Sequence, residues 1–173
     1  TLEVEKMIFS TLNDDHKRKL LNESGISDST ISIAGLSHVP EPYPGIAFPY
    51  YDLSGEKIGE RIKLDIPFKD GGKYYQEKGS NLHLYFLLQD LEKVKSRQDL
   101  YLVEGEKKAL ALRQTLPFAT IAAIPGCWAW SKDQELAPIF HDLNLMGRRV
   151  VLIPDSDIFT KPKVWDGYIG LIR

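Results

Sequence analysis

The chain has 173 residues, of which 43% are hydrophobic and 27% are charged, and its formal net charge is −2 at pH 7. These values exclude a disordered chain, and they exclude a protein that coats duplex nucleic acid through a large positive excess. The single cysteine, Cys127, excludes an intramolecular disulfide, and no apolar run approaches the roughly 20 residues of a membrane-spanning helix. We therefore expect a cytoplasmic protein with no membrane partner.

The first predicted element is a helix over residues 13–24. Asn13 or Thr11 can accept a hydrogen bond from the backbone of the first turn, and Gly25 can end the helix. The segment that follows, up to Pro44, is rich in serine and proline and predicts an irregular connector.

Two strands are predicted next, over residues 46–51 and 57–65, on either side of an Asp-Leu-Ser-Gly turn. In the second strand Ile58, Ile62 and Leu64 share one parity, and the basic residues share the other. This alternation is typical of a half-buried strand. We expect an antiparallel hairpin whose basic outer face comprises Lys57, Arg61 and Lys63.

A glycine-rich connection and a basic, aromatic stretch follow the hairpin. The connection spans residues 70–72, and the stretch begins with Lys73, Tyr74 and Tyr75. Residues 82–91 are apolar enough to be buried, and we expect them to form a helix. Together these elements predict a small α+β lobe over residues 1–98.

The pattern changes from residue 99 onward. Short apolar strands are predicted at 100–103, 119–124 and 150–153, and each is followed by a predicted helix, at 105–115, 132–145 and 164–172. Fully apolar strands that alternate with helices are typical of a parallel sheet covered on both faces. We therefore predict an α/β protein in which the smaller α+β lobe precedes a parallel-sheet domain over residues 99–173.

Acidic residues follow the first and the third of these strands. Glu104 comes directly after the first strand, and Asp155 and Asp157 follow the third. Open parallel sheets bind ligands at the carboxyl ends of their strands, so these carboxylates would meet if the two strands are neighbours. Carboxylate oxygens are the ligands that Mg²⁺ prefers, and a cation would relieve their repulsion. The pattern indicates a site for Mg²⁺ or Mn²⁺ that is suited to phosphodiester chemistry.

Two other interpretations of the acids stay open from the residues alone. An aspartate beside a strand end is commonly a helix cap, and a lone Asp-x-Asp also occurs in sugar-nucleotide transferases. The occurrence of Glu-Gly at 104–105 and Asp-x-Asp at 155–157, in this order within an alternating unit, favours the metal site.

The same patterns resemble the motifs of the TOPRIM fold. Residues 101–110 (YLVEGEKKAL) resemble its first motif, a hydrophobic strand followed by Glu-Gly and then Ala-Leu, and residues 150–157 (VVLIPDSD) resemble its second. Residues 121–130 look like the second strand and glycine turn of primase-like proteins from phages and plasmids. Bacterial DnaG-type primases, topoisomerases and several nucleases share the fold, so the resemblance implies a TOPRIM-like parallel sheet flanked by helices.

The first half of the chain is similar to the DnaG-type primases in particular. Residues 45–52 (GIAFPYYD), followed by Gly55, Gly59 and Arg61, resemble the primase pattern of Phe-Pro, strand, aspartate, glycine, strand, glycine and arginine. The resemblance as a whole covers about residues 45–164. It implies a primase-like nucleotidyltransferase that acts on a single-stranded DNA template.

Matched position by position, the resemblance implies roles for individual residues. Glu104 matches the acid/base or metal-binding glutamate of the family, and Asp155 and Asp157 match its metal-binding aspartates. Arg61 and Lys73 match positions that contact nucleic acid or nucleotide.

Further basic and aromatic residues extend the predicted nucleic-acid surface. Lys63 shares the strand face of Arg61, and Lys107 and Lys108 follow Glu104 at the start of a helix, where they are suited to neutralise phosphate. Tyr74 is suited to stacking on an unpaired base, an interaction worth ~1–3 kcal/mol. A solvated strand face, packed tyrosines and exposed helix lysines are the ordinary alternatives.

The sequence departs from the DnaG-type pattern in three places. Lys108 stands where many members have an aspartate, residues 158–163 replace the usual Ala-Gly, and the sequence ends before the final strand of a complete TOPRIM sheet. We therefore expect a C-terminally incomplete domain from a larger replication protein. Nucleotides and single-stranded DNA are its expected partners, with a replicative helicase or further domains of the same polypeptide as candidates.

The function predicted from the sequence is therefore primase-like synthesis, with two alternatives. A TOPRIM nuclease would use the same acids to cleave. A non-catalytic module would lend a nucleic-acid-binding groove to a partner polymerase or helicase.

Overall fold

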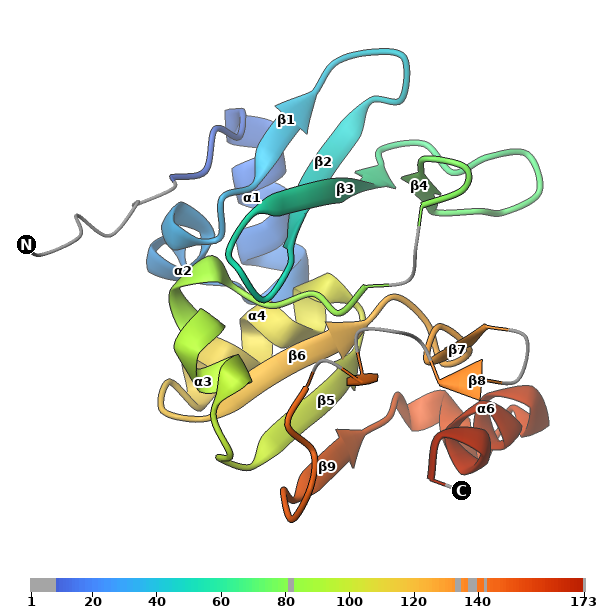
Figure 1. Ribbon diagram of the computed structural model, residues 1–173. Coiled ribbons are helices and arrows are strands. Elements are labelled where there is room, and N and C mark those ends of the chain that lie inside the picture. Colours follow the sequence, from blue (N-terminus) through green and yellow to red (C-terminus); the bar gives the residue numbers. More distant parts are fainter. Residues whose placement is uncertain (1–8, 81–82, 133–134, 137–139, 142, 173) are drawn as a thin grey trace, which may run out of the picture.

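The computed structural model describes residues 9–80, 83–132, 135–136, 140–141 and 143–172, without the side chains of Lys132, Glu135 and Asp157. It contains an antiparallel sheet and a parallel sheet with helices packed around them, which confirms the predicted α/β class (Figure 1). Among the described residues, no helix combines the length and the apolar character that crossing a membrane requires.

The antiparallel sheet is formed by the first half of the chain, and its strands follow one another in chain order. They are β1 (Ser37–Val39), β2 (Gly45–Tyr51), β3 (Lys57–Leu64) and β4 (Tyr74–Gln76). The helices α1 (Asp14–Ser24) and α2 (Asp28–Ile33) precede the sheet in the sequence. The predicted hairpin is confirmed, because β2 and β3 pair antiparallel along most of their length.

Helix α1 begins and ends as its sequence predicts. The side chain of Asn13 accepts a hydrogen bond from the backbone N–H of His16 at 2.8 Å, and Gly25 ends the helix in the left-handed conformation with a φ of 62°. The predicted irregular connector is wrong in part, because α2 and β1 lie within it. Ser27 caps α2 by accepting from the backbone N–H of Thr30, so the serine-rich run is a helix start rather than a loop.

Strand β3 follows the predicted alternation only in its second half. Ile62 and Leu64 are buried against β2, whereas Ile58 is 38% exposed. The basic face is also less uniform than predicted. Lys57 pairs with Glu60 on the surface, but the Arg61 side chain is only 14% exposed and turns toward the parallel sheet.

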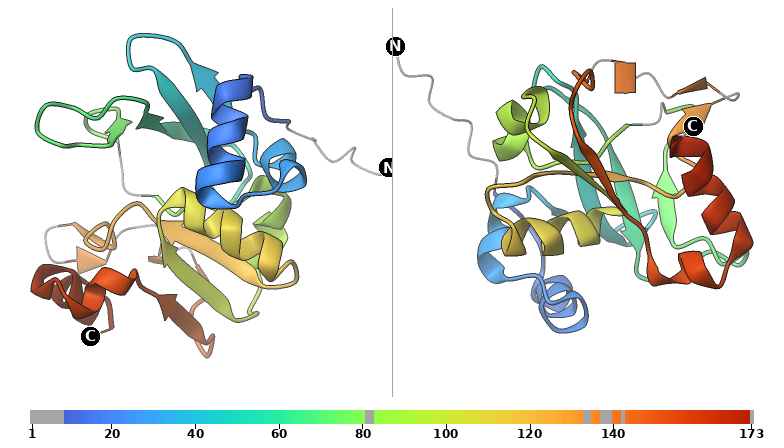
Figure 2. Two further views of the ribbon diagram at one scale, coloured as in Figure 1. Left: turned by 180° about the vertical axis from the view of Figure 1, so that it is seen from behind. Right: turned by 90° about the horizontal axis from the view of Figure 1, so that it is seen from below.

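The parallel sheet has the strand order β6-β5-β9, so the first and third predicted strands are neighbours. Its strands are β5 (Leu100–Glu104), β6 (Thr120–Ile124) and β9 (Val150–Ile153). The helices associated with it are α3 (Leu91–Lys95), α4 (Glu106–Thr115) and α6 (Pro162–Ile172). Helices α3 and α4 both contact β6 and lie on opposite faces of this sheet (Figure 2).

Two predicted helices are wrong in part. Leu84, Tyr85, Phe86 and Leu87 are extended and fully buried, and only the 3₁₀ turn Leu88–Asp90 and α3 follow them. An apolar run that is buried on all sides carries no periodicity that separates strand from helix. Leu82 lies outside the described residues.

The other is the helix predicted over residues 132–145, of which the described residues Phe140 and His141 are helical. Its described residues include part of the two-stranded ladder of β7 (Ser131–Lys132) and β8 (Glu135–Leu136). Leu136, Phe140 and Leu143 nevertheless pack into one core cluster, so shared burial accounts for the spacing that suggested a helix. Residues 133–134, 137–139 and 142 of this range lie outside the described part of the chain.

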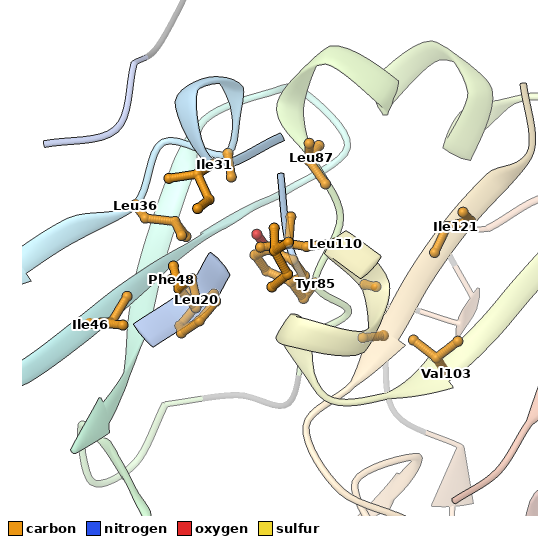
Figure 3. Packing of buried hydrophobic residues seen from close by; sticks show 14 of the residues in the cluster. Leu20, Ile31, Leu36, Ile46, Phe48, Tyr85, Leu87, Val103, Leu110 and Ile121 are labelled. Atoms are coloured by element: carbon orange, nitrogen blue, oxygen red, sulfur yellow. The ribbon is translucent and has the colours of Figure 1, made fainter. Parts of the chain in front are cut away.

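The extended segment around Tyr85 joins the two sheets. Its backbone pairs with Ala123 of β6 through two hydrogen bonds of 2.9 and 2.8 Å, so it lies along the outer edge of the parallel sheet. The Tyr85 ring packs edge-on against the rings of Phe48 and Tyr50 in β2. Figure 3 shows residues of both halves in the same core, including Leu20 and Phe48 on one side and Val103, Leu110 and Ile121 on the other.

Helix α6 packs closely on the loop after β6 because it carries glycines at the contact. A Cβ atom at Gly170 would lie 2.5 Å from the Trp130 ring, so Gly170→Ala forces the ring to shift. We expect this substitution to lower the free energy of unfolding by about 1–3 kcal/mol, less the modest gain in helix propensity. Urea denaturation measures the change, and an unchanged midpoint would contradict the close packing.

Candidate functional site

A cleft of about 530 Å³ lies between the antiparallel sheet and the carboxyl ends of the parallel strands. We call it the inter-sheet cleft. It is lined by Arg61, Lys63, Lys73, Tyr74, Glu104, Gly105, Lys107, Lys108, Pro125 and Asp155. Eight of the nine site residues predicted from the sequence are in this lining. The ninth, Asp157, belongs to the 3₁₀ turn Ser156–Phe159 that follows β9, and its side chain lies outside the described part of the structure.

The acidic residues reach the cleft from neighbouring strands. Val103 of β5 is in register with Ile153 of β9, so Glu104 and Asp155 emerge at the same edge of the sheet. The Tyr168 hydroxyl of α6 donates a long hydrogen bond of 3.4 Å to Oε2 of Glu104. Burial, and then the negative charge of Glu104, raise the pKa of Tyr168 above its usual value, so this hydroxyl stays a donor at neutral pH.

Asp155 is paired with a lysine. Nζ of Lys108, in the first part of α4, forms an ion pair with Oδ1 of Asp155, and both side chains are partly exposed. This contact brings together a predicted metal ligand and a predicted phosphate-binding residue. The Asp155 side chain therefore makes a tertiary contact with α4 in addition to following strand β9.

The donor set at this edge suits a hard divalent cation. Two carboxylates on adjacent strand ends supply the oxygen ligands that Mg²⁺ and Mn²⁺ prefer, and the open cleft leaves room for water and phosphate oxygens. Among the side chains that the structure describes, which do not include that of Asp157, no group of three histidine, cysteine, aspartate or glutamate residues is arranged to hold a metal ion. Glu104 and Asp155 are described carboxylates of the cleft lining that could hold a metal ion.

A buried ionic cluster lies beneath the cleft, and the sequence did not reveal it. Glu106 is fully buried, and its Oε1 accepts hydrogen bonds from the Tyr50 hydroxyl at 2.7 Å and from the Arg61 guanidinium at 3.0 Å. Burial, together with the charge of Glu106, raises the pKa of Tyr50 above its usual value. For Arg61 burial is the largest influence and lowers the pKa, but the charge and hydrogen bond of Glu106, together with Tyr50 and Tyr74, raise it above the usual value, so the guanidinium stays charged.

One sequence signal could have identified Glu106. It precedes Ala109 and Leu110 by three and four positions on α4, and both of those residues are buried. Positions that are three and four apart lie on the same face of a helix, so Glu106 belongs to the face that packs inward. A glutamate there needs a basic partner, and Arg61 of β3 provides it.

The ring of Tyr74 contacts the same ionic cluster through Arg61. The Arg61 guanidinium lies 4.1 Å from the centroid of the Tyr74 ring, so it covers one face of the ring. Burial, followed by the charge of Glu106, raises the pKa of Tyr74 to about 12. The ring stays neutral at physiological pH, and the guanidinium takes one of the two faces on which a base could stack.

The lysines of the cleft are crowded together. Burial lowers the pKa of Lys63, and the nearby positive charges of Lys107 and Lys19 lower it further. Burial also lowers the pKa of Lys107, where Glu23 opposes the effect and the surrounding lysines add to it. Burial and mutual repulsion both disfavour the charged form of these lysines, and a bound anion would offset this effect.

The structure resembles two solved primase structures. It aligns with the DnaG primase catalytic domain bound to single-stranded DNA with a TM-score of 0.56 and 16% identity, over 87% of this chain and 59% of that chain. It aligns with the DnaG catalytic core with a TM-score of 0.53 and 16% identity, over 79% of this chain and 54% of that chain. No protein-family model and no curated protein sequence matches the chain. The similarity establishes a primase-like fold, and the chain spans little more than half the length of these structures.

Proposed function

We propose that the chain is the core of a primase-like nucleotidyltransferase that joins nucleotides on a single-stranded DNA template. The observation that carries the proposal is the inter-sheet cleft, in which carboxylates on adjacent strand ends face a cluster of lysines. A similar structure is that of a primase domain bound to single-stranded DNA, which supports the same class of ligand. The division into lobes at residue 98 and the cytoplasmic location stay predictions, as do a helicase partner and further domains.

In the proposed reaction a 3′-hydroxyl oxygen attacks the α-phosphorus of a nucleoside triphosphate. A new phosphodiester bond forms, the bond to pyrophosphate breaks, and the hydroxyl proton leaves the attacking oxygen. Glu104 serves as the base for that proton or as a metal ligand, and Asp155 and Asp157 serve as metal ligands. Bound Mg²⁺ supplies Lewis-acid stabilisation of the phosphate oxygens.

The basic residues bind the polyanions that take part in the proposed reaction. Lys63, Lys73 and Lys107 line one cleft with the acids, where they meet the negative charge of template or triphosphate. Arg61 is held by Glu106 on one side and by the Tyr74 ring on the other, so its position in the cleft is fixed before a ligand binds. Such preorganisation lowers the entropic cost of binding.

One observation favours a second candidate, the non-catalytic nucleic-acid-binding module. The ammonium group of Lys108 contacts Asp155, where a metal ion is needed for catalysis. A chain that keeps this ion pair would still bind single strands through its lysines, but would not join nucleotides.

The proposal is tested with single-stranded DNA, labelled nucleotides and Mg²⁺, beside a reaction that contains EDTA. Metal-dependent oligonucleotides longer than the starting material support synthesis. Metal-dependent shortening of a labelled strand would replace synthesis with the nuclease alternative. Tight binding of single strands with no product in Mg²⁺ or Mn²⁺ would leave the non-catalytic module in its place.

The lysine cluster leads to a prediction about salt dependence. Lys63→Ala is expected to weaken single-strand binding and to reduce the slope of log affinity against log salt by about 0.7, the value for one phosphate contact on a single strand. Fluorescence anisotropy between low and moderate salt measures the slope. Lys57→Ala is the matched control, because Lys57 lies on the same strand and pairs with Glu60 outside the inter-sheet cleft. Equal slopes for the two variants would exclude a phosphate contact at Lys63.

A further inference from the structure

We propose that Lys108 is a tethered cation that competes with the divalent metal for Asp155 and, when the metal displaces it, binds phosphate in the same cleft. This inference rests on the metal site of the proposed function. It adds a coupling between metal binding and phosphate binding that runs through one side chain.

The geometry distinguishes Lys108 from its neighbour on α4. The ammonium of Lys108 contacts Oδ1 of Asp155, whereas that of Lys107 donates a 2.9 Å hydrogen bond to Oγ of Ser24 on α1. Both lysines line the inter-sheet cleft. Of these two lysines it is Lys108 that holds the carboxylate of Asp155, so Lys108 rather than Lys107 competes directly with a metal ion there.

The ion pair between Lys108 and Asp155 can break at little cost, because both side chains are partly exposed. The Lys108 and Asp155 side chains are 49% and 34% exposed, respectively, whereas those of Arg61 and Glu106 are 14% and 0% exposed. Water screens an exposed pair, so breaking it costs little, while a buried pair cannot separate without leaving a desolvated charge. Lys108 can therefore leave Asp155 with the fold intact.

The ion pair also explains how the acidic edge tolerates its charge before a metal binds. Glu104 and Asp155 emerge from adjacent strands, and the ammonium offsets part of their repulsion. A divalent ion brings twice the charge to the same oxygens and displaces the lysine. The released ammonium stays within the cleft, where the phosphates of the proposed substrates supply its next partner.

The direct test is the affinity for Mn²⁺, measured from the free-ion signal in electron paramagnetic resonance. Lys108→Gln is expected to bind Mn²⁺ about three- to tenfold more tightly than the wild type, because the competing charge is gone. Lys107→Gln removes the same charge from the same helix without touching Asp155, and it is expected to change the affinity less than twofold or so. Asp155→Asn identifies the site through loss of Mn²⁺ binding.

The outcomes separate this inference from the proposed function. If Lys108→Gln and Lys107→Gln bind Mn²⁺ equally well, Lys108 is not a competitor, although the metal site stands. If Asp155→Asn binds Mn²⁺ as tightly as the wild type, or if no member of the series binds it, the metal site fails and the inference fails with it. Circular dichroism on each variant confirms that the fold is retained.

A second measurement tests the phosphate step without any turnover. Binding of a short single-stranded oligonucleotide is measured with and without Mn²⁺, and the ratio of the two affinities gives the coupling between the ligands. The ratio is expected to be about threefold or more larger in the wild type than in Lys108→Gln, because only the wild type releases a lysine. An equal ratio would show that the released ammonium does not reach phosphate.

Discussion

Replacement of Glu104 with glutamine is expected to lower the rate of metal-dependent product formation by about a hundredfold or more. The glutamine side chain has the same shape but can neither accept a proton nor carry the negative charge that holds a cation. Glu104 lines the inter-sheet cleft at the end of β5, and a glutamine keeps a side-chain oxygen that can accept the 3.4 Å hydrogen bond from Tyr168. The loss is therefore expected in the rate at saturating Mg²⁺, with the melting temperature close to that of the wild type.

The matched control for Glu104→Gln is Glu60→Gln. Glu60 is an exposed acid of β3 that pairs with Lys57 outside the inter-sheet cleft, so its replacement makes the same chemical change away from the site. Its rate is expected to stay within a factor of about two of the wild type. A Glu104→Gln rate in the same range would remove Glu104 from the proposed mechanism.

The second large effect is expected on stability. Glu106→Ala should lower the free energy of unfolding by about 3–5 kcal/mol, the usual result of removing one partner from a buried ion pair. The reason is that Arg61 and the Tyr50 hydroxyl would both lose their acceptor in a site from which water is excluded. Urea denaturation followed by circular dichroism measures the loss as a shift of the midpoint.

Two companion variants show which part of Glu106 matters. Glu106→Gln keeps an acceptor for Tyr50 but removes the charge that Arg61 needs, so an intermediate loss is expected. Glu60→Ala breaks only an exposed pair, and it is expected to cost no more than about 1 kcal/mol. If Glu106→Ala costs as little as Glu60→Ala, the buried cluster does not stabilise the fold.

The parallel sheet could be predicted because its strands are apolar along their whole length. The apolar runs of β5 and β6 reflect their burial, β9 is apolar although it is only partly buried, and the acids at the ends of β5 and β9 mark where each strand ends. The sequence left open whether β5 and β9 are neighbours, which was the condition for the acids to meet, and the observed pairing meets that condition. Helix α1 could also be predicted, because its capping residues Asn13 and Gly25 interact with the backbone of neighbouring residues in the sequence.

The remaining elements depend on partners that are distant in the sequence. The run from Leu84 to Leu87 is extended because it pairs with Ala123, almost forty positions away, and no local pattern encodes that pairing. The ladder of β7 and β8 replaces a predicted helix because apolar residues such as Leu136 and Phe140 reach the same core from different backbone conformations. Burial requires apolar residues in these segments, but it does not determine whether the backbone is helical or extended.

The candidate site was predictable as a set of residue types, but not as a set of contacts. Eight of the nine residues named from the sequence, all except Asp157, line one cleft. Their pairing could not be foreseen, because Arg61 is bound to a buried glutamate and Lys108 to an acid of the predicted metal site. Both contacts are tertiary, and each joins segments that are more than forty residues apart in the chain.

The segment around Tyr85 has a consequence for how this architecture can change over evolutionary time. It pairs with β6 while its ring packs on β2, and the core around it draws residues from both halves of the chain. Neither half can be exchanged for that of another protein unless the new partner brings matching side chains. The two halves are therefore expected to be inherited together, and substitutions at Phe48 or Tyr50 to require compensation across the interface.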